Sequence, residues 1–101
     1  MSIVTQISED KKTITIRVRG RFDFNLVQDF RNAYRLLDQP KGNYIVDLAD
    51  TDYMDSSALG MLLHLWKFAG GPDSRIQIIN CRPGVRKIFE ITHFDRKFTI
   101  A

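Results

Sequence analysis

Apolar and polar residues alternate along residues 13–19, which is typical of a β-strand with one buried face. Ile14, Ile16 and Val18 form the apolar side of this segment. Residues 2–7 are also rich in β-branched side chains, and a polar loop joins them to the alternating segment. The chain is therefore predicted to begin with a β-hairpin.

The next segment has a helical period. Apolar residues recur every three to four positions along residues 24–40, which predicts an amphipathic helix. Asp23 or Asn25 can cap its start, and Pro40 with Gly42 ends it. The predicted core stripe of this helix consists of Leu26, Phe30, Tyr34 and Leu37.

The second half of the chain predicts further strands and helices. Residues 43–50 are nearly continuously apolar, which predicts a strand buried on both faces, and residues 75–81 predict another strand. Residues 82–94 predict a short helix with Pro83 in its first turn, where a missing N–H costs nothing. Residues 96–101 predict a last edge strand. The inner side of the short helix would carry Val85, Ile88 and Phe89.

With one more helix after residue 55, the predicted order is β-β-α-β-α-β-α-β. A mixed sheet of four to five strands with helices packed on it buries these faces economically, so the fold class is α/β. The chain has 101 residues, 44% of them hydrophobic, and we expect one domain spanning residues 1–101. A chain of this length builds a core without disulfide or metal cross-links. No metal site or cofactor is expected, because Cys81 stands alone, the aspartates of residues 47–55 lack the EF-hand spacing and its glycine, and no Walker glycine loop is present.

Charge and cysteine content narrow the class of protein. The net charge is +3, but the basic residues are scattered and match no nucleic-acid-binding signature, so no nucleic-acid partner is expected. Cys81 is the single cysteine, which fits a reducing compartment. The first twelve residues show no signal-peptide pattern, and residues 58–69, the longest apolar stretch, are too short to span a membrane. We expect a cytoplasmic protein.

The most informative segment is YMDSSALGMLLHLW, residues 53–66. Asp and Ser are good residues for capping a helix, so capping alone explains why DSS precedes an apolar helix. Yet three capping residues stand where one suffices, and Gly60 costs about 1 kcal/mol relative to Ala within a helix. Close approach of another backbone or packing against the sheet would explain that glycine.

The apolar residues of this helix also exceed what one core stripe needs. Such a helix is either deeply buried or keeps one face for a partner. We predict that the core stripe consists of Leu59, Leu62, Leu63 and Trp66. The residues then left without an obvious place in the core are Met61, Leu65 and Phe68.

A covalent switch is the sharper interpretation of the serines. A phosphate on a first-turn serine is compatible with a helix N-terminus, which favours anions. It would add about −1.5 to −2 charge beside Asp52 and Asp55, in a stretch that already holds four aspartates, Asp47 included. The helix would stay folded, and a partner docked over its start would meet new bulk and charge.

At these residues the sequence resembles the STAS domain family, specifically the bacterial anti-sigma factor antagonists. The segment IVDLADTDYMDSSALG resembles the family signature, a hydrophobic strand ending in D-L followed by M/I-D-S-S-G-L-G. RGRFDF is similar to the G-x-[LF]-D element, and INCRPGVRKIFEITHFDRKF to the later helix. The resemblance covers essentially the whole chain, and Ala58 departs from it by replacing the first glycine of the signature.

The resemblance implies partner switching. The unphosphorylated antagonist binds an anti-sigma factor, a serine kinase breaks the complex by phosphorylating the antagonist, and a phosphatase reverses this. Ser56 matches the acceptor serine, and Ser57 is the second choice. Asp55 would orient the hydroxyl and cap the helix. The residues expected to contact the partner are Asp23, Asp52, Met54, Asp55, Ser57, Ala58 and Met61.

Two other functions are compatible with parts of the sequence. A Ser–His hydrolase is disfavoured because His64 lies eight residues beyond Ser56 on one helix, a rise of about 12 Å, and because no G-x-S-x-G elbow is present. No enzyme activity is expected. The alternative is a constitutive STAS subunit of a lipid-transporter ATPase complex, which would use the same helix face for docking. The double serine favours the regulator, since a scaffold needs no acceptor hydroxyl.

Overall fold

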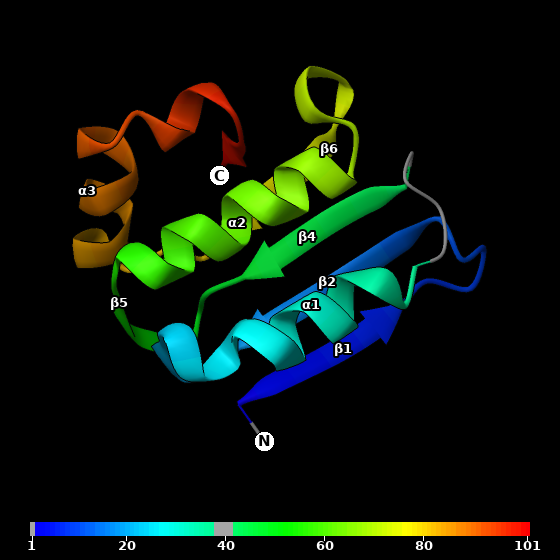
Figure 1. The fold of residues 1–101 in the computed structure, drawn as a ribbon, viewed down its shortest axis with the longest axis horizontal. Coiled ribbons are helices and arrows are strands. Elements are labelled where there is room, and N and C mark those ends of the chain that lie inside the picture. Colours follow the sequence, from blue (N-terminus) through cyan, green and yellow to red (C-terminus); the bar gives the residue numbers. More distant parts are fainter. Residues whose placement is uncertain (1, 38–41) are drawn as a thin grey trace.

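The structure, a computed structural model, describes residues 2–37 and 42–101, and its main sheet has the strand order β1-β2-β4-β6-β7 (Figure 1). β1 is antiparallel to β2, and the other neighbours are parallel, so the sheet is mixed as predicted. The strands of this sheet are β1 (Ile3–Ile7), β2 (Thr13–Val18), β4 (Asn43–Asp47), β6 (Arg75–Ile79) and β7 (Thr99–Ile100).

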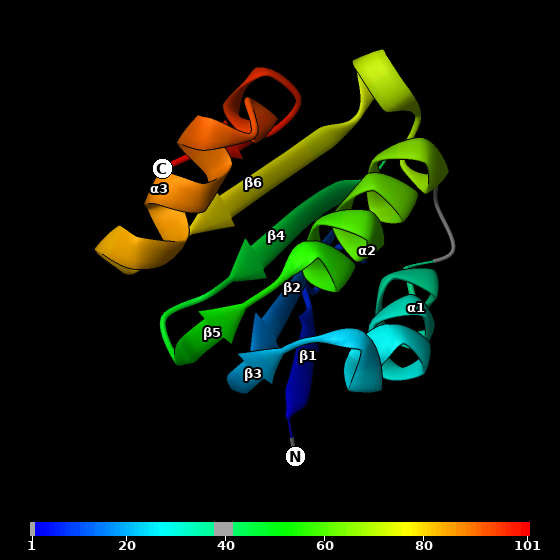
Figure 2. The ribbon, with the colours of Figure 1, turned by 60° about the vertical axis from the view of Figure 1, so that its left-hand side comes forward.

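Two further strands, β3 (Gly20–Phe22) and β5 (Thr51–Met54), form a separate parallel pair at one end of the main sheet (Figure 2). The sequence predicts a turn at residues 19–24 and a loop after residue 50 instead of these strands. Strands of three and four residues are too short for alternation to reveal them. The predicted order is otherwise confirmed.

The helices are α1 (Val27–Arg35), α2 (Ser56–Phe68) and α3 (Pro83–Ile91), with short 3₁₀ turns at Phe24–Leu26, Gly71–Asp73 and Phe94–Arg96. α1 and α2 lie side by side over the same face of the main sheet, and α3 lies beside β5 (Figures 1 and 2). The predicted inner side of α3 is confirmed, because Val85 and Phe89 are buried and Ile88 packs against the core.

The predicted first helix is shorter than expected. A 3₁₀ turn over Phe24–Leu26 precedes α1, and the end signal predicted at Pro40 lies outside the described residues. The predicted stripe is confirmed, since Leu26, Phe30, Tyr34 and Leu37 are all buried.

β4 is buried on one face only, so the prediction of burial on both faces was wrong. Its Tyr44 and Val46 point into the core under the helices, whereas Ile45 is half-buried on the opposite face. There Ile45 lies in register between Thr15 of β2 and Gln77 of β6, so both of its cross-strand neighbours are polar. No helix among the described residues covers this face.

The predicted core stripe of α2 was also partly wrong. The buried residues are Ala58, Met61, Leu62 and Leu65, whereas Leu59, Leu63 and Trp66 are only partly buried. α2 packs against both the sheet and α1, so its buried side is wider than one stripe and includes Met61 and Leu65. Phe68 also finds a place in the core, with its ring centroid 5.0 Å from that of Tyr34.

Candidate functional site

The candidate site lies where two neighbouring parallel strands end and two helical segments begin. In the β3–β5 pair Phe22 is in register with Met54, so Asp23 and Asp55 follow at the same edge. Each aspartate caps the segment after it. The fold therefore brings together DSS and the RFDF turn, which are about thirty residues apart in the sequence.

Asp55 is the N-cap of α2, as predicted. Its backbone is extended, with φ −125° and ψ −172°, and one carboxylate oxygen, Oδ1, accepts hydrogen bonds from the amides of Ser57 at 2.9 Å and Ala58 at 3.4 Å. These are the orphan amides that an N-cap satisfies. Ser56 and Ser57 are then the first two helical residues, so neither serine is the cap.

Ser56 is exposed at the first position of α2. Within residues 2–37 and 42–101 its hydroxyl makes no hydrogen bond, and the orienting bond predicted from Asp55 is absent. The positive end of the helix dipole lies at this position and favours a negative charge. The Ser57 side chain is half-buried and faces α1.

Asp23 has a mainly structural role. It is 8% exposed, its Oδ1 accepts from the Asn25 amide at 3.0 Å, and its Oδ2 lies 3.4 Å from Nε of Arg21. The Arg21 guanidinium also stacks over the Tyr53 ring, 3.9 Å from its centroid. These contacts engage both oxygens of the Asp23 carboxylate within the fold, and its role in contacting a partner stays a prediction.

The acidic loop between β4 and α2 is fixed at its start. Asp47 is buried and accepts hydrogen bonds from the Ala49 amide at 3.0 Å, the Asn80 side chain at 3.1 Å and Arg17 at 3.4 Å. Burial alone would raise the pKa of Asp47, but these hydrogen bonds and the Arg17 charge outweigh it, so the pKa is lowered. Asp47 therefore stays ionised and anchors the loop.

The end of the loop is anchored by Thr51, whose buried hydroxyl donates to the Val18 carbonyl at 2.8 Å. Between the two anchors, Asp50 forms an exposed ion pair with Arg19 at 3.8 Å, which contributes little stability. Asp52 is exposed. Two buried anchors thus fix the backbone around Asp50 and lead into β5, which ends one residue before Asp55.

Three of the predicted contact residues belong to the core. Met54 and Met61 are 6% exposed and Ala58 is fully buried, so these side chains pack in the core beneath the exposed surface. Met61 also lines a groove between α1 and α2. The methyl group of Ala58, where the chain departs from the family signature, is part of the buried core. Of the predicted contact residues, Asp52 is exposed and Asp55 and Ser57 are partly exposed.

A groove between α1 and α2 adjoins Ser56 and was not predicted. Its volume is about 220 Å³, and it includes Ser57 and Gly60 on the α2 side. Phe24, which is 67% exposed, and Val27, which is 38% exposed, lie on the other side. Both residues are apolar although they lie outside the predicted core stripe, and apolar residues without a place in the core were the feature of the sequence that could have indicated this groove.

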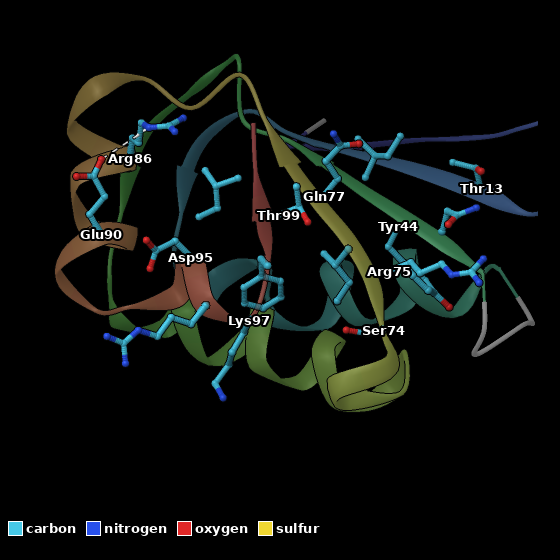
Figure 3. A pocket seen from close by; sticks show the side chains of 16 residues that line it. Thr13, Tyr44, Ser74, Arg75, Gln77, Arg86, Glu90, Asp95, Lys97 and Thr99 are labelled. Atoms are coloured by element: carbon cyan, nitrogen blue, oxygen red, sulfur yellow. Dashed lines mark ion pairs between the residues drawn. The ribbon is translucent and has the colours of Figure 1, made fainter.

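A broader concavity of about 1190 Å³ lies over the uncovered face of the sheet and extends to α3 (Figure 3). Thr13, Gln77 and Thr99 reach it from three strands, and Arg86 and Glu90, 3.7 Å apart, reach it from α3. None of the predicted switch residues lines it. Its other charged residues are Arg75, Asp95, Arg96 and Lys97.

Among the described residues, no group of three or more His, Cys, Asp or Glu side chains is placed to hold a metal ion. No helix in the described parts of the chain is long and apolar enough to cross a membrane.

Comparison with known proteins gives concordant results. The chain matches the family model described as "Mlab, STAS domain" over residues 5–100. It is 46% identical to a STAS-domain containing protein of Pseudomonas aeruginosa (strain UCBPP-PA14) over 101 residues, which are 100% of each chain.

Solved structures show the same fold. The anti-sigma factor antagonist SpoIIAA in its unphosphorylated form matches with a TM-score of 0.79 and 22% identity, over 98% of this chain and 87% of that chain. The phosphorylated form of the Bacillus cell fate determinant SpoIIAA matches at 0.73 and 21%, over 98% and 90%. An anti-sigma factor antagonist from Mycobacterium paratuberculosis matches at 0.78 and 18%, over 98% and 85%.

Proposed function

The chain belongs to the STAS domain family, and from this premise we propose that it is an anti-sigma factor antagonist controlled by phosphorylation of Ser56. It binds an anti-sigma factor in the cytoplasm while Ser56 is unmodified and releases it when a serine kinase adds phosphate. A phosphatase resets it. Binding and release are the whole mechanism, and the protein itself catalyses no reaction.

The observation that carries this proposal is the division of roles within DSS. Asp55 accepts the hydrogen bonds of the free backbone amides at the start of α2. The Ser56 hydroxyl is exposed and makes no hydrogen bond within the described residues. A serine that is not needed for the cap can be modified without unfolding the helix. Ser57 is the poorer acceptor, because it is half-buried against α1.

A phosphate on Ser56 would act on the partner rather than on the fold. The helix dipole favours the new charge of about −1.5 to −2. Outside the helix the same charge joins the exposed Asp52 and the partly exposed Asp55. A partner surface matched to the unmodified site then meets like charge and bulk, and such juxtapositions cost several kcal/mol.

A pull-down from lysate of the source cell tests the proposal. Ser56→Ala and Ser56→Asp serve as paired baits. A protein retained by Ser56→Ala but lost from Ser56→Asp supports the switch and identifies its target. An identical set on both baits contradicts the switch at Ser56.

The alternative function, a constitutive STAS subunit of a lipid-transporter ATPase complex, uses the same exposed surface without a switch. The groove beside Ser56 favours it as much as it favours the antagonist, because a permanent partner also needs a docking surface. The paired baits separate the two functions. Retention of an ATPase subunit by Ser56→Ala and Ser56→Asp alike indicates the constitutive subunit.

A further inference from the structure

The groove between α1 and α2 starts at the candidate switch. Tyr34 and Phe68 lie at the C-terminal ends of α1 and α2, and their ring centroids are 5.0 Å apart. The two helices therefore run in the same direction, as Figure 1 also shows. Phe24 and Ser57 therefore line the end of the groove nearest Ser56, and His64 lines the far end. A partner covering Ser56 would lie directly beside this groove.

Gly60 keeps the middle of the groove open. Apart from its chain neighbours and the adjacent backbone of its own helix, a Cβ built on Gly60 would meet no atom within 4 Å, so neither another backbone nor packing against the sheet requires a glycine here. Both explanations predicted from the sequence are therefore wrong within the described chain. A glycine within a helix still costs about 1 kcal/mol relative to alanine. What the glycine provides is empty space facing solvent.

The size and lining of the groove point to a protein side chain as its occupant. Its volume of about 220 Å³ is below the roughly 300–1,000 Å³ of small-molecule sites, and suits one large side chain. Phe24 and Val27 form apolar walls, and Phe30 and Met61 lie deeper. Pockets of this kind hold the anchor residues of protein interfaces.

One formal charge accompanies this apolar lining. Among the lining residues, which all lie in the described part of the chain, Arg31 is the charged one, and it is half-buried with its side chain toward the groove. A half-buried arginine at an apolar groove favours a carboxylate on the partner. That carboxylate would bind while Ser56 is unmodified and would be repelled when phosphate adds charge beside the groove.

We propose that this groove is the anchor site of the anti-sigma partner, taking one large apolar side chain over Gly60 and a neighbouring Asp or Glu at Arg31. The inference rests on the proposed function and adds the chemistry by which the partner is recognised. It also names the group on the partner that the phosphate would repel, which is the carboxylate of this acidic residue.

The binding test uses the partner retained by the Ser56→Ala bait, purified and titrated calorimetrically against variants of this protein. Gly60→Leu fills the groove and is expected to weaken binding at least tenfold. Gly84→Leu is the matched control, since Gly84 is also a helical glycine whose Cβ would meet nothing within 4 Å. Arg31→Glu is expected to weaken binding about tenfold, and Arg35→Glu, exposed on the same helix, to leave it unchanged.

The outcomes separate the two hypotheses. If Ser56→Asp releases the partner but Gly60→Leu binds as tightly as wild type, the anchor site is overturned and the switch stands. If size-exclusion chromatography with light scattering shows a wild-type dimer that Gly60→Leu abolishes, the occupant is a second copy and the inference is again overturned. Circular dichroism confirms that each variant is folded.

A probe that needs no partner tests the groove by itself. Toluene is titrated into ¹⁵N-labelled protein while amide chemical shifts are followed by NMR. Shifts centred on Ser57, Gly60 and His64 that disappear in Gly60→Leu support an apolar anchor pocket. Absence of these shifts in the wild type overturns the inference, whatever the baits retain.

Discussion

Removing the cap and removing the proposed acceptor should have different consequences, although Asp55 and Ser56 are adjacent. Asp55→Ala deletes the carboxylate that accepts from the amides of Ser57 and Ala58. Ser56→Ala deletes an exposed hydroxyl that makes no hydrogen bond within the described residues. We therefore expect Asp55→Ala to destabilise the protein and Ser56→Ala to leave its stability nearly unchanged.

The magnitude follows from the geometry. Loss of an N-cap costs about 0.5–2 kcal/mol, and loss of a negative charge at a helix N-terminus adds about 0.3–1 kcal/mol. The 3.4 Å bond to Ala58 is long, so most of the effect lies in the 2.9 Å bond to Ser57. We expect Asp55→Ala to cost about 1–2 kcal/mol. Ser56→Ala should stay within about 0.5 kcal/mol.

Urea unfolding followed by far-ultraviolet circular dichroism measures both values. With an m-value of about 1–2 kcal/mol/M, the midpoint of Asp55→Ala should fall by about 1 M at unchanged m. Its Tm should fall by about 4–8 °C for each kcal/mol lost. Asp55→Asn is the matched control, because asparagine keeps the cap and removes only the charge, so it should lose less than half as much.

The reasoning is refuted if Ser56→Ala is destabilised as much as Asp55→Ala. The serine would then contribute to the start of the helix, and loss of function in Ser56 variants would no longer report on a switch. Equal stability of wild type and Asp55→Ala would equally refute the assignment of Asp55 as the cap.

Three further predictions concern the surroundings of the site. Asp47→Asn should cost about 1.5–3 kcal/mol at pH 7, because hydrogen bonds to a buried charge are lost. Since the pKa of Asp47 is lowered, the stability that its charge contributes is present above the ordinary pKa of 3.8 and is lost as the pH falls through the lower folded value. In urea titrations the difference in unfolding free energy between wild type and Asp47→Asn should therefore shrink in acid, and a difference that does not change with pH would contradict the assignment. Thr51→Val should cost about 1 kcal/mol by removing the bond to Val18, measurable as a lower urea midpoint, and an unchanged midpoint would show that this anchor is dispensable. Burial raises the pKa of the Cys81 thiol despite the nearby Arg86, so iodoacetamide should alkylate it more slowly at pH 7.5 in the folded protein than in urea, and equal rates would contradict its burial.

Much of the fold could be predicted because local patterns and tertiary packing agree. The alternation around Ile14 and Ile16 gave a strand whose inner face is fully buried, and the period from Leu26 to Leu37 gave the inner face of α1. Asp55 was predicted as a cap from its position before an apolar run, and it is one. In each case the signal and its cause lie within a few residues of each other.

The errors arose where packing between distant segments decides the outcome. Ile45 lies in an apolar run, yet only one face of the sheet carries helices, and the sequence of β4 does not show which. The sequence left Met61 without a place in the core, whereas α1 beside α2 buries it. That same juxtaposition creates the groove at Gly60, so the groove could not be inferred from either helix alone.

The central claim is that phosphorylation of Ser56 releases the bound partner without unfolding this protein. The most direct test is the affinity of the retained partner for wild-type protein and for protein carrying phosphoserine installed at position 56 during synthesis. The account predicts at least about a 100-fold loss of affinity, or about 2.8 kcal/mol, with an unchanged circular dichroism spectrum. Equal affinity of the two forms would contradict it.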